Sequence, residues 1–146
     1  MACEHADLIA SIASLAGATF NDREDCSPSE PVSILQIHGP QDTVVAYGGG
    51  GSFVSASKDI EIWQAYNQCG SSLEDPQKTL DLDLSVTGMD STITKSTDCP
   101  EGIDVTLWTI HGGSHSPLAS TRDEQSQLAH PSPSTQTRAP LQTQEP

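Results

Sequence analysis

The chain has 146 residues, enough for one domain, and its 20 acidic residues against 6 basic ones give a formal charge of -14. This balance excludes nucleic acid as a partner, because too few basic residues are present to neutralise a run of phosphates. It also argues against an anionic membrane surface, and no apolar run approaches the roughly 18 residues of a membrane-spanning helix. Neither nucleic acid nor a membrane is therefore expected as a partner.

The first third of the chain predicts a helix end and two strands. Residues 2–9 are typical of the end of a helix. The short apolar run of residues 9–16 suits a strand buried on both faces, although its periodicity alone leaves a helix open. A polar loop over residues 18–31 follows. Residues 32–37 are nearly continuous in apolar side chains, as parallel strands covered on both faces are.

The middle of the chain predicts a loop and a helix. Residues 48–51 are four consecutive glycines, but a phosphate-binding loop also needs a lysine that is missing here, so the run is interpreted as a flexible loop. Ser55 is placed to cap a helix over residues 56–68, which carries a broad apolar stripe. Gly70 is the predicted stop of this helix.

Further strands are predicted after the helix. Residues 71–79 are expected to form a loop. Residues 80–86 alternate strictly between apolar and polar, as a half-exposed strand does, and residues 91–97 form a weaker strand that pairs with them in an antiparallel ribbon. Residues 103–110 are a second strand with a strong apolar pattern. Residues 118–146 are rich in Ser, Thr, Gln and Pro and are expected to be a disordered tail.

Four cysteines, Cys3, Cys26, Cys69 and Cys99, lie far apart in the sequence. None forms a C-x-x-C pair, so the spacing does not indicate a zinc knuckle. An even number suits disulfides in an oxidising compartment, but four free thiols remain an alternative, and four cysteines allow three pairings. The residues after Met1 lack a basic region and include charged residues within the first seven positions, so no signal peptide is expected at this end.

Two titratable residues follow the two strongest strands. Asp42 lies in H-G-P-Q-D after the strand at 32–37, and His115 lies in H-G-G-S-H after the strand at 103–110. Sites in open α/β sheets form at the carboxyl ends of strands, so the two side chains are candidates for an Asp–His pair of a nucleophilic triad. The order Asp, then His, is that of the α/β-hydrolases. The alternative is that Asp42 only forms a turn and His115 is only a loop residue.

A metal site is a second possibility for these loops. His111 and His115 are four residues apart, and Asp42 would be the third ligand. That spacing serves zinc well on a helix, whereas here it falls in a Gly-Gly loop. Neither interpretation requires an organic cofactor.

Three segments carry a resemblance to a known family. They read A-C-E-H-A-D-L-I-A-S-I-A-S-L-A-G, P-V-S-I-L-Q-I-H-G-P-Q-D-T-V-V-A-Y-G-G-G and V-T-L-W-T-I-H-G-G-S-H-S-P. In this order they resemble the C-terminal half of the polyhydroxybutyrate depolymerase and feruloyl-esterase family of α/β-hydrolases, over residues 1–117. The resemblance implies that Asp42 is the triad acid and His115 the triad base. It implies an incomplete α/β domain, the C-terminal part of a hydrolase sheet with mostly parallel strands and covering helices.

The chain departs from this family in three places. No serine lies in G-x-S-x-G, so the nucleophile is missing, and the oxyanion-hole segment of the family would lie further upstream. The chain alone is therefore expected to be inactive. Ser116-Pro117 stands where many polymer-degrading relatives have a tryptophan, and residues 118–146 lack the pattern of a last amphipathic helix. A truncated or frame-shifted gene would explain both ends.

The resemblance also implies covalent and functional features. It implies the pairs Cys69–Cys99 and Cys3–Cys26, and hence a secreted full-length parent protein. The implied substrates are polyhydroxyalkanoate esters and feruloyl or acetyl esters of plant polysaccharides, hydrolysed by a serine esterase. The alternative from another class is a non-catalytic, acidic, secreted interaction module. The third is the metal-binding protein described above.

Overall fold

The computed structural model describes residues 1–19, 21–22 and 26–117, so the tail predicted for residues 118–146 lies outside the described residues. Within them, five strands and a helix follow in the order β1 (Ser11–Leu15), β2 (Ser33–His38), α1 (Ala56–Asn67), β3 (Ser72–Leu80), β4 (Ser91–Ser96) and β5 (Val105–Ile110). The described residues include no helix with the length and hydropathy needed to cross a bilayer.

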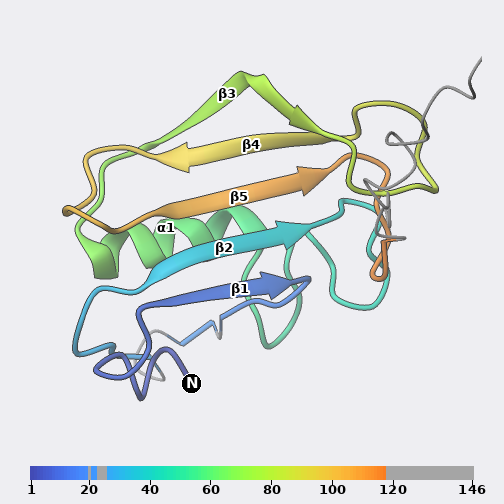
Figure 1. Cartoon of the computed structure of the whole chain (residues 1–146). Coiled ribbons are helices and arrows are strands. Elements are labelled where there is room, and N and C mark those ends of the chain that lie inside the picture. Colours follow the sequence, from blue (N-terminus) through green and yellow to red (C-terminus); the bar gives the residue numbers. More distant parts are fainter. Residues whose placement is uncertain (20, 23–25, 118–146) are drawn as a thin grey trace, which may run out of the picture.

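The strands form one mixed sheet in the order β1-β2-β5-β4-β3 (Figure 1). β1 and β5 both pair with β2 in parallel, whereas β4 pairs antiparallel with β5 and with β3. Two of the four pairings are thus antiparallel, so a mostly parallel sheet is not confirmed. The parallel part brings the carboxyl ends of β2 and β5 to the same edge of the sheet, where their loops meet.

Helix α1 covers one face of the sheet, behind β2 and β5 in Figure 1. The core lies between them, with Ile60 and Trp63 of the helix packed on Ile34, Val105 and Leu107. These three strand residues alternate with half-buried ones, as the twofold period of a strand requires. Burying these apolar side chains stabilises the fold by about 25 cal/mol for each Å² of apolar surface removed from water.

The opposite face of the sheet is not covered by a described helix. Leu35, Thr106 and Trp108 are half-buried there and line a hollow of about 510 Å³. β1 is an edge strand, and its Ser11, Ala13 and Leu15 are exposed. The expectation that residues 9–16 and 32–37 are buried on both faces is therefore wrong, because apolar composition does not reveal whether a second layer is present.

Helix α1 begins as predicted and ends earlier. The Ser55 hydroxyl accepts a hydrogen bond from the Lys58 N–H, which is the expected N-cap. The helix ends at Asn67, and Gln68, with φ of 57°, takes the left-handed cap position in place of Gly70. Gly70 instead donates its N–H to the Thr97 carbonyl at 2.7 Å, so a tertiary contact occupies the residue that the sequence indicated as the stop.

Three local predictions are wrong, and the first two concern residues 2–9 and 71–79. Residues 2–9 form two separate turns, in which the His5 and Ile9 N–H groups donate to carbonyls four residues earlier, and no helix. Residues 71–79, predicted as a loop, lie largely in β3, an edge strand with a register shift between Asp75 and Thr79. An edge strand tolerates such a sequence because only one side must pair.

The strand predicted for residues 80–86 does not form. β3 ends at Leu80, and the chain turns after it. The Asp90 carboxylate accepts hydrogen bonds from the Leu82 and Asp83 N–H groups, and the Asp83 carboxylate accepts one from the Ser85 N–H. These carboxylates take the backbone donors that a strand would have used, so side-chain capping overrides the apolar alternation. The ribbon therefore pairs β4 with β3 instead of with residues 81–86.

Asn67 joins the end of α1 to the start of β2. Its side chain is fully buried, accepting from the Val32 N–H at 3.0 Å and donating to the Val32 carbonyl at 2.7 Å. Replacing Asn67 by alanine leaves two buried backbone groups unpaired, so we expect a loss of roughly 2 to 4 kcal/mol in the free energy of unfolding. Urea unfolding measures the loss, with the exposed Ser57→Ala as the matched control. Equal midpoints for the two variants would contradict this role.

Two disulfides, Cys3–Cys26 and Cys69–Cys99, tie the chain together, and no described cysteine is free. They are the two pairs that the resemblance implies. Cys69–Cys99 joins the end of α1 to the segment before β5, across a separation of 30 residues. Two disulfides are compatible with an extracellular protein.

A loop of that length predicts the contribution of the Cys69–Cys99 bond. Restricting the unfolded chain over this separation is worth about 3 to 4 kcal/mol, so the double variant Cys69→Ala/Cys99→Ala is expected to lose that amount. Urea unfolding of the oxidised wild type and the variant measures it. Reducing the wild type breaks both disulfides. If reduction shifted the urea midpoint but the double variant had the same midpoint as the oxidised wild type, the Cys69–Cys99 bond would not stabilise the fold.

Candidate active site

Two glycines bring the loops after β2 and β5 together. Gly39 follows β2 and Gly113 follows β5, and a Cβ atom on Gly39 would overlap the backbone of Gly113. The Gln41 N–H donates to the Gly113 carbonyl at 3.2 Å. Only glycine permits this backbone approach, so the H-G-P and H-G-G sequences determine the distance between the two loops. Asp42 and His115 come from these loops.

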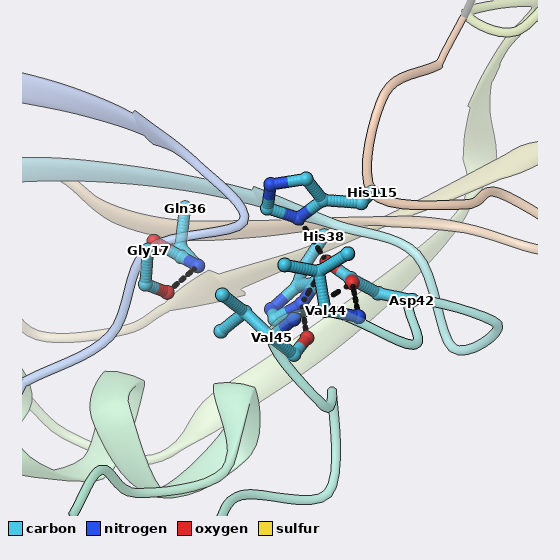
Figure 2. Close-up of polar contacts among 7 residues, drawn as sticks. All are labelled: Gly17, Gln36, His38, Asp42, Val44, Val45 and His115. Atoms are coloured by element: carbon cyan, nitrogen blue, oxygen red, sulfur yellow. Dashed lines mark hydrogen bonds and ion pairs between the residues drawn. The ribbon is translucent and has the colours of Figure 1, made fainter.

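The structure places Asp42 and His115 in contact. The Asp42 Oδ2 atom lies 2.9 Å from the His115 Nδ1 atom, as Figure 2 shows. The carboxylate is fully buried, whereas the side chain of His115 is 40% exposed. Because an ionised carboxylate only accepts hydrogen bonds, Nδ1 carries the proton and donates it to Asp42. The second ring nitrogen faces away from Asp42 and keeps a lone pair that can take a proton.

Backbone groups hold the Asp42 carboxylate from its other side. Its Oδ1 atom accepts the Val44 N–H at 2.8 Å and the Val45 N–H at 2.9 Å, which is a turn closed by the aspartate on its own following residues. Burial raises the pKa of Asp42, but the hydrogen bonds from His115, Val45 and Val44 outweigh it and lower the pKa from 3.8 to about 2. Asp42 is therefore ionised at neutral pH.

This lowered pKa predicts a dependence of stability on pH. A carboxyl group with a depressed folded-state pKa stabilises the fold above its unfolded pKa, near 4, and the contribution is lost as the pH falls through 2. For Asp42 the contribution is about 2 kcal/mol, from a pKa of 3.8 unfolded and about 2 folded. The free energy of unfolding of Asp42→Asn, subtracted from that of wild type at each pH from 6 to 2, measures it.

The subtraction is needed because a second buried carboxyl group titrates in the opposite sense. Burial raises the pKa of Asp59, while hydrogen bonds from Thr19 lower it in part. Its charged form is penalised at neutral pH, so protonating it as the pH falls stabilises the fold. A difference between wild type and Asp42→Asn that stayed constant from pH 6 to 2 would contradict the assignment to Asp42.

His38 is a site residue that the sequence interpretation missed. It is the last residue of β2 and is 1% exposed. Its Nε2 atom lies 2.8 Å from the Val45 carbonyl and 3.2 Å from Asp42 Oδ2 (Figure 2). The alternation of the strand indicates its direction, because His38 follows Ile34 and Gln36 on the face of β2 that packs on the helix. The residue therefore points inward and not into the loop.

His111 lies apart from the pair. Its Nε2 atom is 3.1 Å from the Thr92 hydroxyl of β4, while His115 is directed toward Asp42. The three residues of the metal hypothesis are thus not brought together. Among the described side chains, no group of three histidines, cysteines or carboxylates is placed to hold a metal ion.

Comparisons with known proteins give one similarity to a named protein. Protein-family models give no match to the chain. The chain is 31% identical over 125 residues to feruloyl esterase B of Piromyces equi, an alignment that covers 77% of this chain and 21% of that protein. The chain therefore spans about a fifth of the length of this relative. The similarity is consistent with an esterase-like family, and it does not distinguish a polyhydroxybutyrate depolymerase within it.

Proposed function

We propose that the chain is the acid-and-base part of a serine hydrolase that cleaves carboxylic esters. The observation that carries the proposal is the buried Asp42 carboxylate 2.9 Å from His115 Nδ1, with the other ring nitrogen turned away from it. Asp42 holds the imidazole in the tautomer whose Nε2 accepts a proton, and it stabilises the imidazolium that forms. The similarity to a feruloyl esterase supports the same chemistry.

The proposed nucleophile is a serine outside this chain. No serine of the sequence lies in G-x-S-x-G. A serine delivered to Nε2 of His115 would lose its proton to that nitrogen as it attacks the ester carbonyl, and His115 would then return the proton to the leaving alcohol. The donors that stabilise the oxyanion would come with the serine-bearing segment. The 146-residue chain alone is then inactive.

The proposed substrates are esters of the classes that the resemblance implies. They are feruloyl or acetyl esters of plant polysaccharides and polyhydroxyalkanoate esters. The two disulfides support a secreted parent protein, because such bonds persist in oxidising compartments. The name of the relative favours feruloyl esters among these substrates.

A fusion experiment tests the proposal. The coding sequence that precedes Met1 in the genome is read in frame, and the segment carrying G-x-S-x-G is fused to the chain. The fusion is expected to hydrolyse p-nitrophenyl acetate and methyl ferulate, whereas the 146-residue chain hydrolyses neither. If the 146-residue chain alone hydrolysed either ester, and His115→Ala abolished that activity, the proposal that the nucleophile lies outside the chain would be wrong.

The missing G-x-S-x-G favours a second candidate, a non-catalytic acidic secreted module. A stop codon directly before Met1, with no in-frame G-x-S-x-G upstream, would support this module and contradict the esterase. Both candidates predict an inactive isolated chain, so the upstream sequence and the activity of the fusion separate them.

A further inference from the structure

We infer that His38 is a positioning residue that holds Asp42 in place for its hydrogen bond to His115, an inference that rests on the proposed function. No hydrogen bond of the described structure joins His38 to His115. It lies behind the carboxylate, where its side chain is 1% exposed and that of Asp42 is fully buried. Its role would be exerted through Asp42 and the Val45 backbone.

The surroundings of the imidazole determine its tautomer. Nε2 faces two acceptors, the Val45 carbonyl at 2.8 Å and Asp42 Oδ2 at 3.2 Å, so this nitrogen must carry a proton. Nδ1 is buried and has no hydrogen-bond partner among the described residues. An N–H at Nδ1 would be a buried donor without an acceptor, which is costly, and a doubly protonated ring would carry the same donor with a charge. The contacts therefore favour the tautomer with its proton on Nε2.

That single proton supports the carboxylate in two ways. It is shared between Asp42 Oδ2 and the Val45 carbonyl, so His38 donates to the oxygen that accepts from His115. By fixing the Val45 carbonyl it also fixes the peptide next to the Val45 N–H, which donates to Asp42 Oδ1. Without His38, the half-exposed His115 is the one donor to Oδ2 left among the described residues, and the turn around Oδ1 loses its anchor.

Neighbouring side chains hold the ring of His38. Tyr47 packs edge-on against it, with ring centroids 5.3 Å apart and planes at 64°, and the Tyr47 hydroxyl lies 2.9 Å from the Thr109 hydroxyl of β5. Asp59 of α1 is a second described carboxyl group that interacts electrostatically with His38, besides Asp42. The imidazole is thus held by β2 and by the loop between β2 and α1, and Tyr47 of that loop is joined to β5 through Thr109. This makes His38 a rigid support for a loop carboxylate.

The test reads the protonation of each ring nitrogen by ¹⁵N NMR of the full 146-residue chain at pH 7, with histidine labelled. We expect His38 as the Nε2–H form and His115 as the Nδ1–H form. In His38→Leu the Nδ1–H form of His115 should fall from nearly the whole population to less than half, because a loosened Asp42 no longer selects it. In His38→Gln, whose amide N–H can reach the position of Nε2, the form should be kept. His111→Gln is the matched control and should leave it unchanged.

These outcomes separate a positioning role from a structural one and from the proposed function. Retention of the His115 Nδ1–H form in a folded His38→Leu protein would overturn the inference while leaving the Asp–His pair intact. If His38→Leu does not fold, the wild-type spectrum decides, since an Nδ1–H form of His38, with no proton on Nε2, would equally overturn it. If wild-type His115 shows no preference for Nδ1–H, the inference and the pair on which the proposed function rests both fall.

Discussion

His115→Ala in the serine-bearing fusion is expected to lower kcat for a short acyl ester by about 10⁴- to 10⁶-fold, the range seen when a triad histidine or its partner is removed. The reason is that, in the proposed triad, His115 is the base that takes the serine proton. His111 is the matched control, because it lies on the same loop directly after β5 but bonds to Thr92 of β4. His111→Ala should change kcat by less than about tenfold, since it stands outside the proton path.

Initial rates at matched folded concentration, with near-ultraviolet circular dichroism as the check on folding, decide between the two histidines. If His111→Ala abolished activity while His115→Ala kept it, the assignment of the base would be wrong. If both residues were essential and the activity followed added zinc, the triad would give way to metal-assisted hydrolysis.

Asp42→Asn in the same fusion is expected to lower kcat by about 10⁴-fold with little change in KM. The amide has the shape of the carboxylate, and its oxygen can still accept the Val44 and Val45 N–H groups that Oδ1 accepts in the wild type. Its NH₂ group would then face His115 and donate to Nδ1. That hydrogen bond places the ring proton on Nε2, so the nitrogen that should accept the serine proton is already occupied.

The control for this variant is Asp104→Asn. Asp104 is an exposed residue directly before β5, away from the site, and it forms an ion pair with Lys95. It should change kcat by less than about twofold, because an exposed pair contributes little. A loss in Asp42→Asn that appeared in KM alone would contradict the proposed role, since it would indicate a binding residue and not the orienting carboxylate.

The local pattern of the sequence was sufficient for β2, β5 and the start of α1. Two apolar segments, each followed by an H-G sequence, predicted the strands β2 and β5, and the Ser55 cap followed by an apolar stripe predicted the helix. These features are local, because a cap is a contact within one turn and an apolar run depends only on neighbouring side chains. The same reasoning placed Asp42 and His115 at the ends of two strands, as candidates for one site.

Residues 71–86 show where local pattern was insufficient. Alternation predicted a strand at 80–86, yet the Asp90 carboxylate turns the chain there, and β3 forms earlier because β4 offers it a partner. The Asp90 carboxylate and strand β4 both lie outside the segment 80–86, and their contacts override a strand preference of about 1 kcal/mol or less per residue. The register of an edge strand is set by that partner.

The sequence by itself determined which side chains carry the candidate chemistry: an aspartate and a histidine, each after an apolar strand and a glycine. Only the tertiary structure decided that they touch, because the backbones of Gly39 and Gly113 must approach each other, and this depends on β2 and β5 being neighbours. It also decided the part of His38, whose inward direction follows from the strand but whose contact with Asp42 requires the loop to fold back. The hydrogen bonds between these groups gain strength when the surrounding residues bury them away from water. Those surrounding residues come from distant parts of the chain, so no local pattern could have specified the contact.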